Sequence, residues 1–271
     1  MIKKYTCIFA ALLIMSPFLM AQTLEEVVVT AQIREQSLQD VPISISAISG
    51  EDIADRSVDS LQSLSASVPN FMVVETQIDT SISIRGVRSG ANKGFEQSVP
   101  MNFDGVSYPR SQLARTPLVD LERVEVLRGP QPTLFGKNAI GGVVNVTSAK
   151  PTEEFEGKFS TSHESEHGED QSLLVLSGAL SDNLLGRITV STREMDGWIT
   201  NQKMKRLEPQ RDETYIRGQL AWTSGDADYN LKVETADFDS TGYAMEAIAP
   251  QDGYGLVFRG PIAVETTENW V

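Results

Sequence analysis

"DLERVEVLRGPQPTLFGKNAIGGVVNVTSAKP", residues 120–151, consists of two valine-rich segments joined by a glycine-rich connection. Each segment is bounded by turn residues and is a candidate β-strand. The connection supplies Gly129, Gly136, Gly141 and Gly142, which suit tight turns and close backbone approach. It does not form a nucleotide-binding P-loop, because its lysine is followed by Asn138 instead of serine or threonine.

The residues on the N-terminal side extend this pattern into a compact α+β domain over 40–150. ISISAIS (43–49) alternates as a strand, and VDSLQSLSASVPN (58–70) has apolar residues at helical spacing before a proline. Three further strand candidates are separated by turn residues: FMVV (71–74), SISIRGV (81–87) and VPMNFDGV (99–106).

On the C-terminal side the apolar pattern has a period of two residues. Four segments alternate polar and apolar side chains, namely 155–163, 186–193, 214–223 and 229–236, whereas 172–180 is fairly apolar on both faces. Segments of about ten residues suit tilted transmembrane strands. Short connections at 181–183 and 224–227 alternate with a long one at 194–213, as in outer-membrane barrels. A soluble antiparallel sandwich would give the same alternation and stays open as an alternative.

The number of strand segments suggests an incomplete barrel. About five strands fit here, whereas a barrel wide enough to hold a folded domain needs about 22. Residues after Phe238 read as a long polar loop, and TTENWV (266–271) reads as part of it. We therefore expect an N-terminal fragment of a longer protein.

The N-terminus and the overall composition point to export. MIKKYTCIFAALLIMSPFLMA (1–21) has two lysines, a short apolar run and a small-residue end, as in a secretory signal peptide. Its Cys7 is the only cysteine, so the mature chain has no disulfide and no thiol nucleophile. The net charge of −14 makes the chain a poor nucleic-acid binder.

Four stretches, by their order and spacing, resemble the TonB-dependent outer-membrane receptors: EEVVVTAQIREQSLQDVPISISAISGEDI (25–53), SISIRGV (81–87), FDGVSY (103–108) and 120–151. The resemblance implies an α+β plug domain at 40–152, followed by antiparallel transmembrane β-barrel strands of an incomplete barrel at 153–271. It also implies location in the outer membrane of a Gram-negative cell, in contact with outer-membrane lipid.

The resemblance implies a TonB box, followed by a periplasmic tether, within 22–39. Its residues are Glu25, Glu26, Val27, Val28, Val29, Thr30 and Ala31. Three consecutive valines favour an extended chain, which can add to the exposed sheet edge of a partner. The implied partner is TonB, which is powered by an inner-membrane energising complex. An ordinary first strand of the folded domain is the alternative interpretation.

The resemblance also implies residues at two further places in the plug. Arg85 and Arg128 match plug arginines that contact barrel carboxylates, and Glu122 and Glu125 carry the acidic side of the same motif. Two loops, 88–98 and 107–117, are expected to meet the cargo. Their basic and aromatic residues suit an anionic, ring-bearing ligand such as a ferric siderophore: Arg88, Lys93, Phe95, Tyr108, Arg110 and Arg115.

The resemblance implies a receptor that imports a scarce solute, and for the family in general a ferric siderophore or another iron complex is the expected cargo. Such a receptor is not an enzyme and is expected to need no cofactor. A secreted or surface β-rich binding or adhesion module without energy coupling is the alternative.

HESEH (163–167) matches a zinc-protease pattern only formally, because in an extended strand His163 and His167 would lie about 13 Å apart. DADYN (226–230) lacks the glycine and the closing glutamate of a calcium loop.

Overall fold

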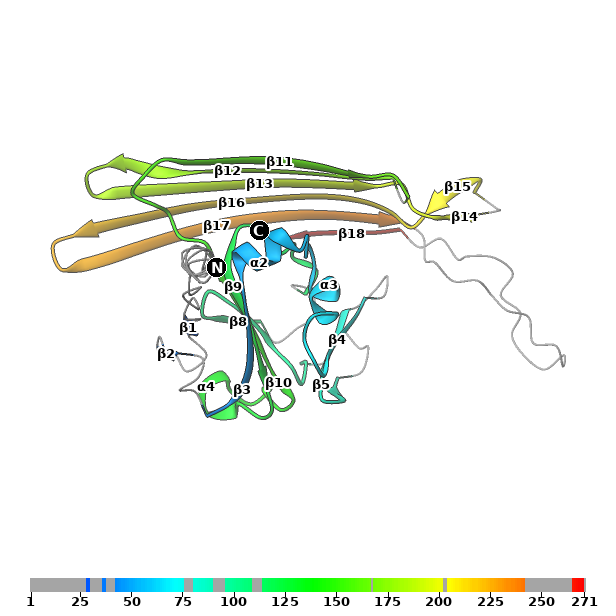
Figure 1. The fold of residues 1–271 in the computed structure, drawn as a ribbon, viewed down its shortest axis with the longest axis horizontal. Coiled ribbons are helices and arrows are strands. Elements are labelled where there is room, and N and C mark those ends of the chain that lie inside the picture. The colour runs from blue at the N-terminus through cyan, green and yellow to red at the C-terminus, as the bar shows by residue number, and fades with distance from the viewer. Residues whose placement is uncertain are drawn as a thin grey trace, which may run out of the picture.

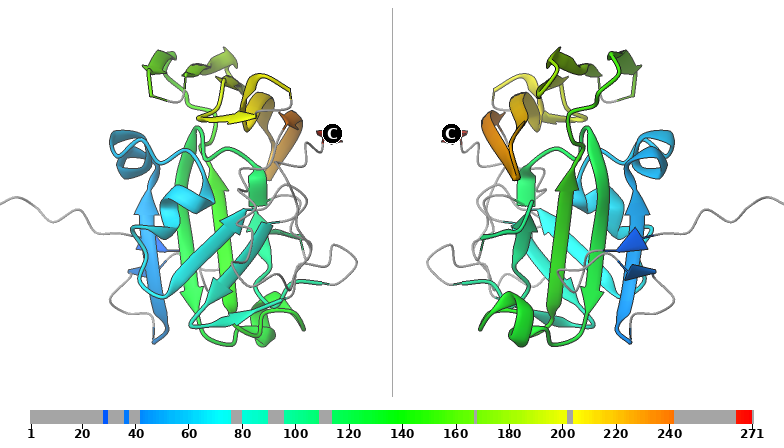
Figure 2. Two further views of the ribbon diagram at one scale, coloured as in Figure 1. Left: turned by 90° about the vertical axis from the view of Figure 1, so that its right-hand side faces the viewer. Right: turned by 90° about the vertical axis from the view of Figure 1, so that its left-hand side faces the viewer.

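The computed structural model describes residues 28–29, 36–37, 42–75, 80–89, 96–108, 114–166, 168–201, 204–241 and 265–270. Within these ranges the chain forms two bodies (Figure 1). Residues 42–150 form a compact α+β domain, and the strands from residue 156 onward form a long antiparallel sheet. The compact domain lies against one face of the long sheet, as the two turned views in Figure 2 also show. No helix in the described ranges is long and apolar enough to cross a membrane.

The compact domain contains two sheets. A five-stranded sheet has the order β3-β9-β10-β7-β8, and a three-stranded sheet has the order β4-β5-β6. β9 and β10 pair antiparallel at the centre, with Val126 opposite Val144, and β7 joins β10 in parallel. The strands are β3 (Ser44–Ser49), β4 (Phe71–Glu75), β5 (Thr80–Ile84), β6 (Val87–Arg88), β7 (Met101–Phe103), β8 (Val106–Tyr108), β9 (Leu121–Arg128) and β10 (Gly142–Ser148). The two strands expected from residues 120–151 are therefore confirmed.

Three short helices complete this domain: α2 (Gly50–Asp55), α3 (Leu61–Ser65) and α4 (Pro132–Phe135). α3 falls within the helix expected at 58–70, and Ser60 caps it by accepting the Ser63 amide. The sequence pattern did not predict α2, because it indicated only a strand over 43–49 at this point. Ser49 instead accepts the Asp52 amide and starts a helix there.

The core of the compact domain lies between its helices and sheets. Leu61 and Leu64 of α3 pack in one buried cluster with Val124 and Val126 of β9, all fully buried. Gly142 at the start of β10 shows the close backbone approach that the sequence indicated. Its φ is +151°, and a Cβ there would lie 2.2 Å from the carbonyl oxygen of Leu127.

The long sheet has the strand order β11-β12-β13-β16-β17-β18, and each neighbouring pair is antiparallel. Its strands are β11 (Glu156–Glu164), β12 (Glu169–Ser181), β13 (Leu184–Met195), β16 (Gln210–Ser224), β17 (Ala227–Thr241) and β18 (Glu265–Trp270), with a side hairpin of β14 (Ile199–Asn201) and β15 (Arg206–Glu208). β18 corrects the expectation that residues after Phe238 form only a loop, because it pairs with β17.

The connections differ at the two ends of the long sheet. Two-residue turns join β12 to β13 and β16 to β17, since Ser181 pairs with Leu184 and Ser224 with Ala227. The connection from β13 to β16 at the opposite end contains the β14–β15 hairpin (Figure 1). The alternation of short and long connections is therefore confirmed.

The two faces of the long sheet differ in polarity. The face turned away from the compact domain is apolar and exposed, with Leu231 52% and Val233 57% accessible. The face toward the compact domain carries polar rows such as Ser177–Arg187–Gln219–Lys232, four residues paired across β12, β13, β16 and β17. A soluble sandwich would cover the apolar face with a second sheet, whereas the described residues leave it open.

Candidate functional site

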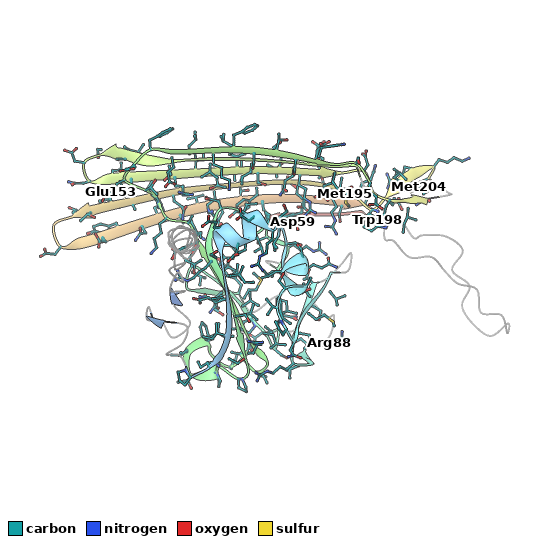
Figure 3. All side chains as sticks on the ribbon, viewed as in Figure 1. Asp59, Arg88, Glu153, Met195, Trp198 and Met204 are labelled. Atoms are coloured by element: carbon teal, nitrogen blue, oxygen red, sulfur yellow. The ribbon has the colours of Figure 1, made fainter. Side chains whose placement is uncertain are left out.

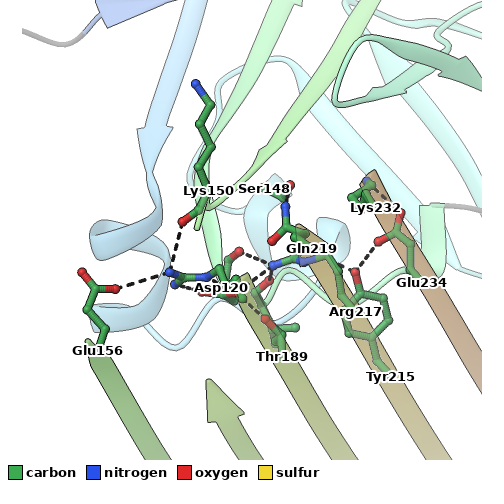
Figure 4. A network of polar contacts seen from close by, with 12 residues as sticks. Asp120, Ser148, Lys150, Glu156, Thr189, Tyr215, Arg217, Gln219, Lys232 and Glu234 are labelled. Atoms are coloured by element: carbon green, nitrogen blue, oxygen red, sulfur yellow. Dashed lines mark hydrogen bonds and ion pairs between the residues drawn. The ribbon is translucent and has the colours of Figure 1, made fainter. Parts of the chain in front are cut away.

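The interface between the compact domain and the long sheet is centred on Asp120, the residue before β9. Arg187 on β13 donates from Nε and Nη2 to the two carboxylate oxygens, at 2.9 and 2.5 Å. Arg217 on β16 donates from Nη2 at 2.9 Å, and the Thr189 hydroxyl donates to the same oxygen (Figure 4). Thr189 and Arg217 are paired across the two strands, so the sheet register brings these donors together.

A second contact lies at the tight turn between β7 and β8. Asp104 lies in this turn with a positive φ of 48°, and its carboxylate faces the long sheet. The carboxylate accepts the Ser148 amide and hydroxyl at 2.8 and 2.7 Å, and it pairs with Lys232 Nζ at 2.6 Å. Gln219 Nε2 donates to the same Ser148 hydroxyl at 3.1 Å. The Lys232 ammonium also lies 5.0 Å from the centroid of the Phe103 ring, a cation–π contact.

Side chains of the long sheet join these two contacts into one network. The Tyr215 hydroxyl donates to Glu234 at 2.6 Å, and Lys232 pairs with the other oxygen of Glu234 at 2.9 Å. Arg217 Nη1 reaches the Tyr215 hydroxyl at 3.4 Å. Side chains of the long sheet therefore connect Asp120 to Asp104. Figure 4 shows Arg217, Tyr215 and Glu234 in this path.

A third contact joins the loop before α3 to β13. Arg193 Nη2 lies 2.8 Å from a carboxylate oxygen of Asp59, and Arg193 also pairs with Glu169 on β12 at 2.9 Å. Figure 3 shows Asp59 at the side of the compact domain that faces the long sheet. Asp59 is held from its own side by the Ser63 hydroxyl, which donates at 2.6 Å.

The interface thus has acidic residues on the compact domain and basic residues on the sheet. Burial raises the pKa of Asp120, but hydrogen bonds from Arg187 and Thr189 and the nearby arginine charges hold it below its ordinary value. Burial likewise raises the pKa of Asp104, and Lys232 and Ser148 bring it below the ordinary value. Both carboxylates are ionised at neutral pH, so charge pairs join the two bodies. A small apolar cluster lies beside them, in which Val119 packs with Tyr215 and Phe238 of the sheet.

The residues expected to join the plug to the barrel have contacts within the compact domain. Glu125 is fully buried and accepts from Asn145 Nδ2 at 2.7 Å and from Arg123 Nε at 3.1 Å. Glu122 also pairs with Arg123. Arg128 Nη1 donates to the Pro69 carbonyl at 3.3 Å. Asp59, Asp104 and Asp120 of the compact domain meet cations of the sheet, and contacts of Glu122 and Glu125 with the barrel stay a prediction.

Arg85 occupies the tight turn between β5 and β6, with a positive φ of 52°, and its side chain is exposed. Its amide donates to the Asn70 carbonyl at 2.8 Å. The contacts of Arg85 and Arg128 with barrel carboxylates therefore stay a prediction. The described part of the long sheet is too narrow to surround the compact domain (Figure 2).

Sequence reasoning missed the three aspartates because each one lies in or beside a turn, where acidic residues are common. A signal was nevertheless present in the strands. Arg187, Arg217 and Lys232 fall on the polar side of period-two segments. Basic side chains that face a lumen filled by another domain need acidic partners on that domain.

The other expected sites are only partly described. Arg88 is exposed in β6, Tyr108 ends β8 and packs against the core, and Arg115 is half-buried. Lys93, Phe95 and Arg110 lie outside the described residues. Of the expected TonB box, the structure describes Val28–Val29 as β1, paired antiparallel with β2 (Gln36–Ser37) and outside both sheets of the compact domain. Glu25, Glu26, Val27, Thr30 and Ala31 lie outside the described residues.

His163 of the formal zinc motif lies in β11, and its Nδ1 is 2.8 Å from a carboxylate oxygen of Asp170 on β12. His167 lies outside the described residues. Among the residues that are described, no group of three or more histidine, cysteine, aspartate or glutamate side chains is arranged to hold a metal ion.

Comparison with known proteins agrees with this architecture. The model of the TonB-dependent Receptor Plug Domain family matches residues 37–143. The chain is 35% identical over 188 residues to the iron-regulated outer membrane virulence protein of Vibrio cholerae. This match covers 65% of the chain and 28% of that protein. It is 34% identical over 139 residues to the vitamin B12 transporter of Vibrio vulnificus, covering 49% of the chain and 22% of that protein.

Among solved structures, the ferric yersiniabactin uptake receptor from Yersinia pestis superposes with a TM-score of 0.65 at 25% identity. The match covers 73% of this chain and 32% of that receptor. The chain therefore spans about a third or less of the length of each of these proteins.

Proposed function

Because this chain belongs to the TonB-dependent receptors of the outer membrane, we propose that it forms the plug and first barrel strands of an importer. The importer binds a scarce solute outside the cell and admits it by energy-coupled movement of the plug, without catalysing a reaction. In this proposal the compact domain is the plug, and the long sheet is part of the barrel wall.

The observation that carries the proposal is the charged interface between the two bodies. A plug must close a pore firmly and still be able to move. An apolar interface would resist movement, because separating it exposes apolar surface to water. The contacts of Asp59, Asp104 and Asp120 are ion pairs and hydrogen bonds, and water can replace such contacts when the bodies separate.

The apolar face of the long sheet supports placement of the sheet in a bilayer. Phe159 is 72% exposed and Leu231 52% exposed on this face, although the chain as a whole is acidic. In water such a face would favour aggregation, whereas lipid is a suitable solvent for it. The two-residue turns are expected at the periplasmic end and the longer connections at the outer end.

For the cargo we propose a ferric siderophore or another iron complex. Support comes from the basic and aromatic residues of the two loops, which suit an anionic, ring-bearing ligand. The Yersinia pestis relative is named for uptake of ferric yersiniabactin, and the Vibrio vulnificus relative for vitamin B12. Uptake tests on the full-length protein with a panel of iron complexes and with vitamin B12 distinguish these two classes of cargo.

For energy coupling we propose that 25–31 is the TonB box. In this scheme cargo docking makes the box available in the periplasm, and TonB adds it as a strand to its own sheet. Recognition of this kind depends mainly on main-chain hydrogen bonds. The pairing of Val28–Val29 with Gln36–Ser37 supports an extended conformation for these two valines.

The test is a proline substitution at Val28 in the full-length protein. Proline removes the backbone donor that a strand ladder needs, whereas Val28→Ala keeps it. We expect Val28→Pro to abolish uptake of the radiolabelled cargo while cell-surface binding of the cargo is unchanged, and Val28→Ala to retain uptake. A protonophore should stop uptake by the wild-type protein. Normal uptake by Val28→Pro would rule out coupling through this segment. Cargo binding by the wild-type protein without protonophore-sensitive uptake would instead favour a surface binding module.

A further inference from the structure

An apolar groove crosses the outer face of the long sheet, on the side away from the compact domain. Its volume is about 470 Å³, within the range of about 300–1,000 Å³ that is typical of ligand sites. The walls come from Phe155, Leu180, Leu220 and Leu231, on and beside four different strands. These side chains belong to the face that the polar interface does not use.

Glycines form the floor of the groove. Gly178 on β12 pairs with Gly186 on β13, and Gly218 lies on the neighbouring strand β16. A Cβ built at Gly218 would have no other heavy atom within 4 Å, so the space above this residue is open. The groove is therefore open above Gly218, whereas Leu180 lies close to Gly186 and Phe155 lies close to Gly178.

Two features at the edge of the groove indicate the orientation of a ligand. Trp222 and Tyr229 stack with centroids 4.6 Å apart, two residue pairs closer to the two-residue turn than Leu220 and Leu231. Tryptophan and tyrosine with this placement mark the level of lipid headgroups. The groove therefore begins at the headgroup level and continues toward the hydrocarbon.

The edge of the sheet beyond the aromatic pair is acidic. Asp182 and Asp226 occupy the two-residue turns, and Glu153 lies beside the end of β12, where its carbonyl accepts the Ala179 amide. Figure 3 shows Glu153 at this end of the sheet. Glu154 adds a further exposed acid. Lys150, three residues before Glu153, adds one positive charge and leaves the edge net acidic.

We propose that this groove binds one acyl chain of a diacyl phospholipid whose headgroup carries an ammonium group. The apolar walls and open floor accept the chain, and the acidic edge attracts the ammonium. A headgroup with a net negative charge is disfavoured, because it would face like charges at the same level. The proposal rests on the outer-membrane location and is independent of coupling to TonB, so it can fail while the uptake function holds.

The experiment uses the purified, delipidated full-length protein and native mass spectrometry. The probes are phosphatidylethanolamine and phosphatidylglycerol with identical acyl chains. We expect one phosphatidylethanolamine to bind with a dissociation constant about tenfold lower than that of phosphatidylglycerol. Gly218→Leu fills the groove without backbone strain and should weaken binding about tenfold. Val190→Leu, on the same face outside the groove, is the matched control and should bind as the wild type does.

A second variant tests the headgroup and protects the test against misfolding of Gly218→Leu. Asp182→Lys lies in an exposed turn and should abolish or reverse the preference for phosphatidylethanolamine. Heat-modifiable gel mobility shows whether each variant contains a folded barrel. Wild-type binding by folded Gly218→Leu would refute the groove as the site. Equal binding of the two lipids to the wild type, or an unchanged preference in Asp182→Lys, would refute recognition of the ammonium.

Discussion

Asp120 and Arg217 are 97 positions apart in the sequence, and their side chains form an ion pair of 2.9 Å between the compact domain and the long sheet. The Arg217 side chain is 1% exposed and that of Asp120 is 5% exposed. Removal of one member of a buried pair leaves a charge without compensation, which costs more than the intact pair contributes. Asp120 also holds Arg187, so its loss affects two buried cations.

We predict that Asp120→Asn destabilises the docking of the compact domain by about 3–5 kcal/mol. Asparagine keeps the shape of the side chain but removes the carboxylate that pairs with Arg217, and it leaves Arg187 with only the more exposed Glu156, 3.3 Å away. The measurement is hydrogen exchange of the β9 amides in the full-length protein as a function of urea, which reports the free energy of opening at this strand.

The matched control is Asp52→Asn on α2. Asp52 pairs with Arg56 at 3.0 Å, with both side chains about half exposed. Exposed pairs of this kind contribute about 0–1 kcal/mol. If both substitutions lowered the opening free energy of β9 equally, burial of the Asp120 network would not be the source of docking strength.

The sequence allowed the local features of the interface to be predicted, but not the pairs. Period-two alternation placed Arg187 and Arg217 on the polar face of their strands, and that assignment is confirmed. Their partner was missed because Asp120 is far away in sequence and reads as a turn residue. Which residues meet across the interface depends on how the two bodies dock, and alternation within one strand carries no such information.

Strand lengths show a second limit of sequence reasoning. The segment expected at 214–223 extends in the structure from Gln210 to Ser224. Residues 210–213, QRDE, are polar on both faces, so alternation cannot reveal that the strand continues through them. Backbone pairing with β17 continues there regardless, with Gln210 opposite Thr241.

The Asp104–Lys232 pair should show measurable coupling in a double-mutant cycle. Both side chains are 25% exposed, so solvent weakens the pair compared with the Asp120 network. We predict a coupling free energy of about 0.5–3 kcal/mol from Asp104→Asn, Lys232→Met and the double variant, measured by the β9 exchange assay. Additive effects of the two substitutions would mean that the 2.6 Å contact does not contribute to docking.

Gly142 and Gly136 should respond differently to alanine, although both have positive φ. A Cβ at Gly142 would lie 2.2 Å from the Leu127 carbonyl oxygen and 2.7 Å from Ile84 Cδ1, whereas a Cβ at Gly136 meets nothing within 4 Å. We predict a loss of about 1–3 kcal/mol for Gly136→Ala from backbone strain alone. Gly142→Ala adds about 1–3 kcal/mol for overpacking. In thermal unfolding of the full-length variants, Gly142→Ala should have a lower unfolding temperature than Gly136→Ala. The reverse order would contradict the close approach of Gly142 to the Leu127 carbonyl oxygen.

Acidification should weaken docking through Asp104 and Asp120. The pKa of each is lower in the folded state than the ordinary value of 3.8. Each therefore binds protons less readily when docked, and its contribution to stability is present above pH 3.8 and is lost as the pH falls through the lower folded value. We predict that the opening free energy of β9 changes little between pH 7 and pH 5 on account of these two groups and falls below about pH 3.8. The double variant Asp104→Asn/Asp120→Asn lacks both titrating groups. Its opening free energy of β9 should be lower at neutral pH and should fall less steeply at acidic pH. An equally steep fall in the double variant would assign the acid sensitivity to other carboxylates.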